Sequence, residues 1–177
     1  MSGHTPADQN AYYASHPPAA IAGLRPVPVN LGGMAFEGHG SEINAIFELT
    51  CECGNKGFHV LAHDGDEWVV DPVYVRCSAC ARQTVIFDAR TQGYDGALGH
   101  LPETPLPTTA LQELSADGIG PAPYRVAVRY EYTDDVLADP DFADWKGREA
   151  ELFTWLTVIV RPLSGDAAES VFDQECA

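Results

Sequence analysis

The alternation of apolar and polar residues that begins at Ile43 is the clearest pattern along the chain. Ile43, Ala45, Phe47, Leu49 and Cys51 occupy every second position, and most of the positions between them are polar. A period of two residues directs one set of side chains to each face of a β-strand. We therefore predict a strand with one buried face.

Similar patterns predict further strands, at residues 57–63, 67–77, 82–89, 124–132, 152–162 and 169–175. The Asp64-Gly65 pair between the first two of these is typical of a hairpin turn. Pro72 interrupts residues 67–77 and lacks a backbone N–H, so it favours an edge position or a bulge. Antiparallel sheets are expected, because the strands are short and follow one another closely.

The segments between the strands have a different composition. Residues 1–28 are rich in proline and small residues, which favours an extended or irregular arm that stays mobile or lies across the folded part. The proline-rich segment 93–123 is predicted to be a surface connector with a short helix at residues 108–116. The acidic segment 133–151 is expected to contain a helical turn or two.

Two pairs of cysteines stand at corners between predicted strands. Cys51 and Cys53 form a C-x-C pair, and Cys77 and Cys80 form a C-x-x-C pair. Tetrahedral zinc takes four such donors, and two sequence-local pairs can supply them across a hairpin. Four cysteines leave no open position for catalysis, so a structural zinc ion is the preferred interpretation. Gly54 and Gly57 would allow the sharp turn of the first pair.

Other uses of these cysteines are less favoured. A thioredoxin-like pair would open a helix after a strand, whereas Cys77 and Cys80 lead into another strand. Disulfides require an oxidising compartment, and residues 1–10 lack the basic patch and apolar run of a secretion signal, so a reducing cytosol is expected. The fifth cysteine, Cys176, is interpreted as a free tail thiol, with an intermolecular bridge or a reactive site as alternatives.

The stretches "CECG" and "CSACA", each between two predicted strands, resemble the two knuckles of a zinc ribbon. This resemblance covers about residues 43–92 and implies a three- or four-stranded antiparallel fold around a structural Zn(Cys)4 site. Two features depart from the ribbon pattern: the first knuckle has one intervening residue instead of two, and Ala81 replaces the glycine common after the second.

The expected fold class is mainly β, with few short helices. It comprises an irregular N-terminal arm (1–42), a zinc-ribbon-like module of antiparallel hairpins (43–92), the connector (93–123) and a second antiparallel β section (124–177). The second section would pack against the module and could form one compact unit with it.

Net charge adds a constraint on partners. The formal charge is -16, and most of it lies in the C-terminal half. Such a surface repels phosphate backbones and anionic membranes, so it serves solubility or favours a basic protein partner. No apolar segment approaches the roughly 18 residues that span a bilayer. We expect a soluble, cytoplasmic protein that does not bind membranes.

Other residues offer weaker candidate chemistry. His59 and His63 flank the cysteine site and could be spare ligands, although half-exposed strand histidines are the commoner case. The acidic cluster in segment 133–151 lacks the spacing of a calcium-binding EF-hand loop and is interpreted as solvated. The aromatic residues could form a binding face but are expected mostly to cover the sheet. The acidic cluster is Asp134, Asp135, Asp139, Asp141 and Asp144, and the aromatic set is Trp68, Trp145, Trp155, Tyr130 and Tyr132.

Three functions are therefore considered. The first is a non-enzymatic protein-interaction module with a structural zinc ion and an acidic surface. The second is a nucleic-acid-binding zinc ribbon, the commonest role that the resemblance implies, with a local basic face from Lys56, Arg76, Arg82 and Arg90. The third is an enzyme whose site lies between the two β sections and uses His59 or His63 as a base. No recognised set of nucleophile and base supports the third, so catalysis is not expected.

Overall fold

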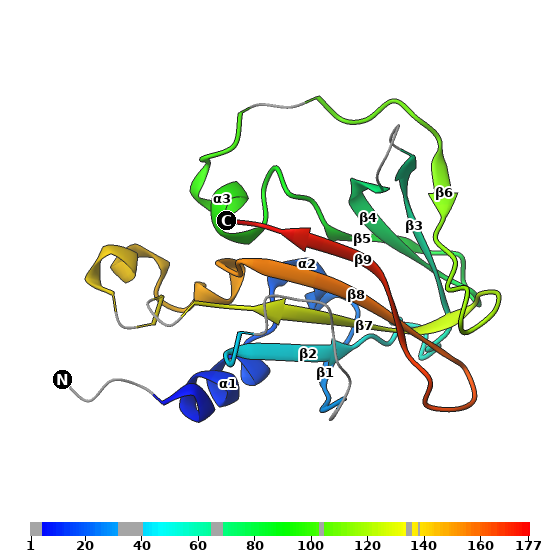
Figure 1. Ribbon diagram of the computed structural model, residues 1–177, viewed down its shortest axis with the longest axis horizontal. Coiled ribbons are helices and arrows are strands. Elements are labelled where there is room, and N and C mark those ends of the chain that lie inside the picture. The colour runs from blue at the N-terminus through cyan, green and yellow to red at the C-terminus, as the bar shows by residue number, and fades with distance from the viewer. Residues whose placement is uncertain (1–4, 32–40, 65–68, 103–104, 134–135, 138) are drawn as a thin grey trace.

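The computed structural model describes residues 5–31, 41–64, 69–102, 105–133, 136–137 and 139–177. These residues form one antiparallel sheet of nine strands with a few short helices, which confirms the mainly β prediction (Figure 1). The strands are β1 (Val27–Pro28), β2 (Asn44–Glu48), β3 (Phe58–Asp64), β4 (Val69–Cys77), β5 (Gln83–Phe87), β6 (Leu111–Glu113), β7 (Tyr124–Glu131), β8 (Trp155–Pro162) and β9 (Glu169–Glu175). The helices are α1 (Pro6–Ser15), α2 (Ala19–Ala22) and α3 (Gly93–Leu98), with 3-10 helices η1 (Pro140–Trp145) and η2 (Glu149–Glu151).

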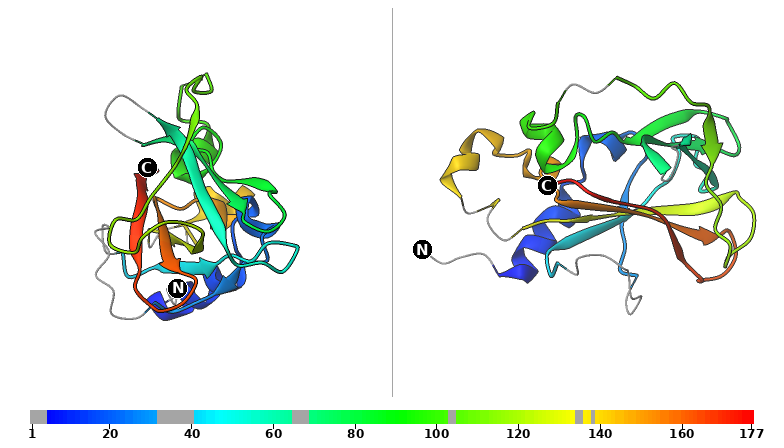
Figure 2. Two further views of the ribbon diagram at one scale, coloured as in Figure 1. Left: turned by 90° about the vertical axis from the view of Figure 1, so that its right-hand side faces the viewer. Right: turned by 45° about the horizontal axis from the view of Figure 1, so that its top comes forward.

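Strand β7 is the central strand of the sheet. It pairs with β2 and with β8, and β9 continues the sheet beyond β8. β3 pairs with β7 at one position only, where Phe58 lies opposite Tyr124. From this point β3, β4 and β5 turn away as an antiparallel meander, so the sheet curls into a half-barrel (Figures 1 and 2). We call β2-β7-β8-β9 the first wall and β3-β4-β5 the second wall.

This topology mixes strands from the two predicted β sections. β2 pairs with β7 and makes no ladder with β3, so strands from residues 43–92 and from residues 124–177 share one sheet. The two sections therefore do not pack as separate hairpin layers. The segment boundaries given above stay predictions.

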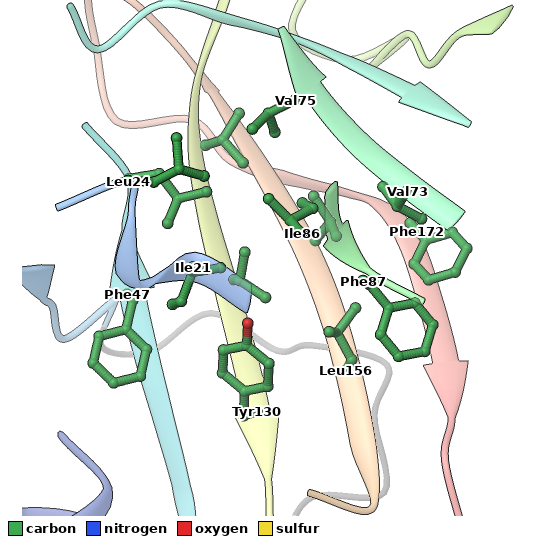
Figure 3. Close-up of a cluster of buried hydrophobic side chains, with 14 of the residues drawn as sticks. Ile21, Leu24, Phe47, Val73, Val75, Ile86, Phe87, Tyr130, Leu156 and Phe172 are labelled. Atoms are coloured by element: carbon green, nitrogen blue, oxygen red, sulfur yellow. The ribbon is translucent and has the colours of Figure 1, made fainter. Parts of the chain in front are cut away.

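The hydrophobic core fills the space between the two walls. Figure 3 shows part of this core, to which β2 contributes Phe47, β7 Tyr130, β8 Leu156, β4 Val73 and β5 Ile86, and all of these side chains are buried. The alternate residues from Ile43 to Cys51 are also buried. The predicted alternation is thus confirmed, and burial of these side chains supplies the main driving force for closing the walls on each other.

The opposite face of the first wall is charged and largely buried. Arg125 and Arg161 lie directly opposite each other on β7 and β8, an arrangement of like charges that is unfavourable by itself. The carboxylate of Glu48 offsets it, because it accepts hydrogen bonds from both guanidinium groups, at 2.8 Å from Arg125 Nη2. Arg129 and Glu131 form a second buried ion pair on β7, with a separation of 2.6 Å.

The N-terminal arm is helical, which corrects the expectation of extended or irregular backbone. Pro6 occupies the first turn of α1, where proline costs no hydrogen bond, and Thr5 forms a capping box with Asp8. The ring of Tyr13 stacks on Tyr132, which directly follows β7, with ring centroids 3.5 Å apart. The described part of the arm therefore lies across the folded part.

The structure can be compared with the predictions for three other segments. The prediction of a helix at residues 108–116 is wrong, because residues 111–113 form β6 and pair with β3. At Pro72 the bulge interpretation holds, because β4 pairs on both edges and its register against β3 shifts between Leu61 and His63. The helical turns expected in residues 133–151 are η1 and η2. The predicted Asp64-Gly65 turn reaches residues 65–68, outside the described residues.

Candidate metal centre

The four paired cysteines form one cluster. The first pair lies in the connection from β2 to β3, and the second pair ends β4 and begins the turn to β5. The ligand atoms of Cys51, Cys53, Cys77 and Cys80 all lie within 4.8 Å of one another. The expectation that the two pairs meet is confirmed.

The distances between sulfur atoms fit a tetrahedron of thiolates. Cys51 Sγ lies 3.6 Å from Cys80 Sγ, and Cys53 Sγ lies 3.6 Å from Cys77 Sγ. A disulfide would need about 2.0 Å, and the five cysteines are free thiols. Four sulfurs at roughly 2.3 Å from a central ion would be about 3.8 Å apart, close to the distances seen here. Each close pair joins one knuckle to the other.

Local backbone geometry shapes the first knuckle, residues 51–55. The amide of Cys51 donates to the carbonyl of Asn55, and the amide of Gly54 donates back to the carbonyl of Cys51, both at 2.8 Å. Gly54 has a φ of 88°, a left-handed conformation that glycine adopts without strain. Gly54 therefore has the turn-forming role that its position predicted.

The second knuckle, residues 77–82, repeats this arrangement. Cys77 donates its amide to the carbonyl of Arg82 at 2.9 Å, and Ala81 donates to the carbonyl of Cys77 at 3.0 Å. Ala81 has a φ of 59°, so a residue with a β-carbon stands in a left-handed position. This is the position at which a glycine is common in the ribbon pattern, and the alanine keeps the knuckle geometry.

Hydrogen bonds tune the thiols of the cluster. Burial raises the pKa of Cys77, but hydrogen bonds from the backbone of Cys80 and from the side chain of Asn55 outweigh burial and lower this pKa to about 6. For Cys51, a backbone hydrogen bond from Cys53 lowers the pKa, whereas burial and the neighbouring sulfurs raise it to about 12. The donors aimed at Cys77 favour the thiolate, which is the form that binds a metal ion.

Asn55 joins the two knuckles, a role that its sequence position did not reveal. Its Nδ2 lies 3.3 Å from Cys77 Sγ, 3.0 Å from Ser78 Oγ and 2.7 Å from the carbonyl oxygen of Gly57. The amide of Ser78 also donates to the carbonyl of Gly57 at 2.9 Å. A β-carbon on Gly57 would lie 2.8 Å from Ser78 Oγ, so Gly57 permits a close approach of the knuckles and does not serve as a left-handed turn residue.

The cluster occupies the corner where the two walls of the half-barrel meet. Cys51 follows β2 in the first wall, whereas Cys77 ends β4 in the second wall. Phe58 pairs with Cys77 on one side and with Tyr124 of β7 on the other, so the only β3–β7 pair lies beside the cluster. An ion held by all four sulfurs would tie the walls together where their backbone pairing is weakest.

His59 and His63 are engaged elsewhere. His59 Nδ1 lies 2.8 Å from Glu113 Oε1, and His63 Nδ1 lies 2.7 Å from the carbonyl oxygen of Thr109. Among the described residues, the cluster of potential metal ligands contains the four cysteines without either histidine. Both side chains are partly exposed, as the commoner interpretation expected, and they connect β3 to β6 and to the segment before it.

Cys176 is a free thiol, as expected, and it is buried rather than exposed in a loose tail. Its side chain is 7% exposed, and burial raises its pKa. Its amide and carbonyl are fixed by Thr154 and Asp95, each at 2.8 Å. The thiol therefore belongs to the core between β8 and α3.

The acidic and aromatic sets divide between surface and core. Asp139 caps η1, while Asp141 and Asp144 are exposed. Tyr130 and Tyr132 are core residues, as expected, whereas Trp145 and Trp155 are half-buried. Asp134, Asp135 and Trp68 lie outside the described residues.

No family model, curated protein or solved structure in the three comparisons matches this chain. None of the described helices combines the length and apolar character needed to cross a membrane. The candidate metal centre is therefore the feature on which a functional argument can be built.

Proposed function

We propose that the protein is a non-enzymatic interaction module whose half-barrel is held by one structural zinc ion bound to Cys51, Cys53, Cys77 and Cys80. The observation that carries the metal proposal is the cluster of four sulfurs with cross-knuckle distances of 3.6 Å. Zinc prefers four-coordinate thiolate sites of this kind. Four protein ligands close the coordination shell, so a structural role fits better than a catalytic one.

The interaction role is supported by charge. The formal charge of -16 favours a basic protein as partner. The proposed module is soluble and acts in the cytoplasm. Nucleic-acid binding is disfavoured because the basic residues near the knuckles have acidic partners. Lys56 lies 3.7 Å from Glu48, Arg76 lies 3.9 Å from Glu113, and Arg82 and Arg90 pair with Glu52 and Asp88.

An enzyme site at the junction of the β sections receives little support. Strands of both sections share one sheet, and packed side chains fill the space between its walls. His59 and His63 line neither of the two cavities described among the structured residues. These two cavities therefore give no support to a base role for either histidine.

The metal proposal is tested by native mass spectrometry of protein purified without added metal. We expect one zinc ion per chain, lost on mild acidification. Cys77→Ser should lose the ion and much of the folding free energy, because metal binding at such a site stabilises the folded state. Cys176→Ser is the matched control, since Cys176 lies outside the cluster, and it should keep the ion. A metal-free chain whose mass is lower by two or four hydrogens would contradict the zinc proposal and indicate disulfide bonds instead.

The interaction role is tested separately by affinity. Binding to a purified basic partner should weaken steeply between low and physiological salt, because exposed charges are screened over about 8–10 Å at physiological ionic strength. Gel-shift titrations with single- and double-stranded DNA and RNA at low salt should show no complex. A stable nucleic-acid complex under these conditions would favour nucleic-acid binding over the protein-interaction role.

A further inference from the structure

A second candidate site lies in a cavity at the end of the first wall remote from the cysteines. The cavity has a volume of about 480 Å³ and is lined by Tyr94, Thr133, Asp139, Asp141, Phe142, Thr154 and Ala177. Its size falls within the range of small-ligand pockets. Its walls come from α3, from η1 and from the ends of β7, β8 and β9, which meet at the left of Figure 1.

The lining combines aromatic surface with negative charge. The rings of Tyr94 and Phe142 pack edge to face, with centroids 5.9 Å apart. Asp139 and Asp141 supply two carboxylates to the lining. Among the described residues, neither forms an ion pair with lysine or arginine. Other carboxylates of the chain do form such pairs, namely Glu48, Glu52, Asp88 and Glu113. Aromatic faces and carboxylates both attract organic cations.

Backbone hydrogen bonds hold the walls of the cavity in place. The amide of Tyr94 donates to the carbonyl of Phe153, and the amide of Thr154 donates to the carbonyl of Glu131, both at 2.8 Å. Asp139 fixes the start of η1, because its Oδ1 accepts from the amide of Asp141 at 2.8 Å. A site built from such fixed elements loses little conformational freedom when it binds a ligand.

The cavity is distant from the candidate metal centre. Tyr124 begins β7 beside the cysteines, whereas Thr133 lies just beyond the other end of this strand. Nine residues of extended chain at about 3.3 Å each separate the two by roughly 30 Å. Loss of the metal and loss of ligand binding at the cavity can therefore be measured independently.

We propose that this cavity binds an organic cation, an ammonium or guanidinium group, between Tyr94, Phe142 and the carboxylates of Asp139 and Asp141. The inference rests on the proposed interaction role for the source of the cation, which is a lysine or arginine side chain of a basic protein partner. A free polyamine presents the same chemistry, and the experiment separates the two sources.

The test is an NMR titration of the full, metal-loaded chain, followed through backbone amides. The probes are capped lysine, capped arginine, capped Nε-acetyl-lysine, a short lysine-containing peptide and spermidine. We expect saturable shifts at Tyr94, Phe142 and Thr154 with the charged probes, and binding at least about fivefold weaker with the acetylated, neutral probe. The lysine peptide should bind more tightly than spermidine.

Matched variants assign the binding to the cavity. Asp141→Asn removes one charge and Phe142→Leu removes an aromatic face, and each should weaken binding of capped lysine by about fivefold. Asp144→Asn removes an exposed charge from the same segment outside the lining, so it should bind as the parent protein does. Amide spectra of the variants report whether the fold is kept.

The outcomes are distinct. Absence of saturable shifts with every charged probe, or equal shifts with the neutral one, would overturn the cation site and leave the zinc proposal standing. Tighter binding of spermidine than of the peptide would support the cation site, but it would contradict a partner protein as the source of the bound cation. A chain that holds no zinc in native mass spectrometry but binds the charged probes would overturn the metal proposal and leave the cation site standing.

Discussion

Ala81 holds the second knuckle in a conformation that its β-carbon opposes. Its φ of 59° lies in the left-handed region, which costs a non-glycine residue about 1 kcal/mol or more. We predict that Ala81→Gly raises the free energy of unfolding of the metal-loaded protein by about 0.5–1 kcal/mol, seen as a melting temperature about 1–4 °C higher. Ala79→Gly is the control, because Ala79 is exposed in the same knuckle without a positive φ, and it should destabilise. Equal effects of the two substitutions on the melting temperature would contradict backbone strain at Ala81.

Tyr130 carries a buried hydroxyl that has no hydrogen-bond partner among the described residues. Burying an unpaired hydroxyl costs free energy, on the order of 1–3 kcal/mol. We therefore expect Tyr130→Phe to leave stability unchanged or raise it by up to about 1 kcal/mol in urea denaturation. Tyr124→Phe provides the contrast, since its hydroxyl donates to the carbonyl of Gly120 at 2.7 Å and accepts from the amide of Ala116. That change should lower stability by about 1–2 kcal/mol, and the opposite ranking would argue for a hidden partner of Tyr130.

Among the elements, α3 depends on a close approach at Gly96. A β-carbon there would lie 2.1 Å from the backbone carbonyl oxygen of Ala89, which cannot rotate away as a side chain could. We predict that Gly96→Ala lowers the free energy of unfolding by about 2–3 kcal/mol and increases amide exchange in α3. Because Tyr94 lies on α3, the variant should also weaken cation binding at the cavity. Gly23→Ala has open space and an ordinary φ of -71°, so a similar loss there would refute the steric explanation.

The elements also show what sequence patterns can predict. Alternation identified β2 and β7 because each buries every second side chain in the core. Helix α1 has no signature in the sequence pattern, because its buried residues are only Gln9 and Tyr13, which give no apolar stripe. The residues of β6 favour a helix locally, but pairing with β3 decides their conformation.

The candidate site divides in the same way. Cysteine spacing within each knuckle is local, so the sequence predicts the four candidate ligands. The roles of Asn55 and Gly57 depend on the second knuckle lying against the first, a contact between residues more than twenty positions apart. Only the folded arrangement of the walls reveals them.

For the whole molecule, buried tyrosines predict a loss of stability in alkali. Burial raises the pKa of Tyr13, Tyr130 and Tyr132 above the usual value of 10, so these groups stay neutral in the folded state. Their contribution is fully present below pH 10 and is lost as the pH rises above 10, where only the unfolded chain releases the protons. Each of these tyrosines should lower the free energy of unfolding by up to about 1.4 kcal/mol per pH unit there. Urea denaturation between pH 8 and 11 measures the slope, which Tyr130→Phe should make shallower by up to about 1.4 kcal/mol per pH unit.

Metal removal should affect the two walls of the half-barrel unequally. β7 and β8 pair along eight residues, whereas β3 is joined to β7 by the single pair of Phe58 and Tyr124. Without an ion across the knuckles, we expect the second wall to open first, because its remaining attachment is side-chain packing. Hydrogen exchange followed by mass spectrometry, with and without a chelator, should show faster exchange in β3, β4 and β5 while β7 and β8 stay protected. Cys176→Ser with its metal retained should match the untreated protein. A uniform increase over all strands would mean that the ion supports the whole fold, and no change in any strand would mean that it supports none of it.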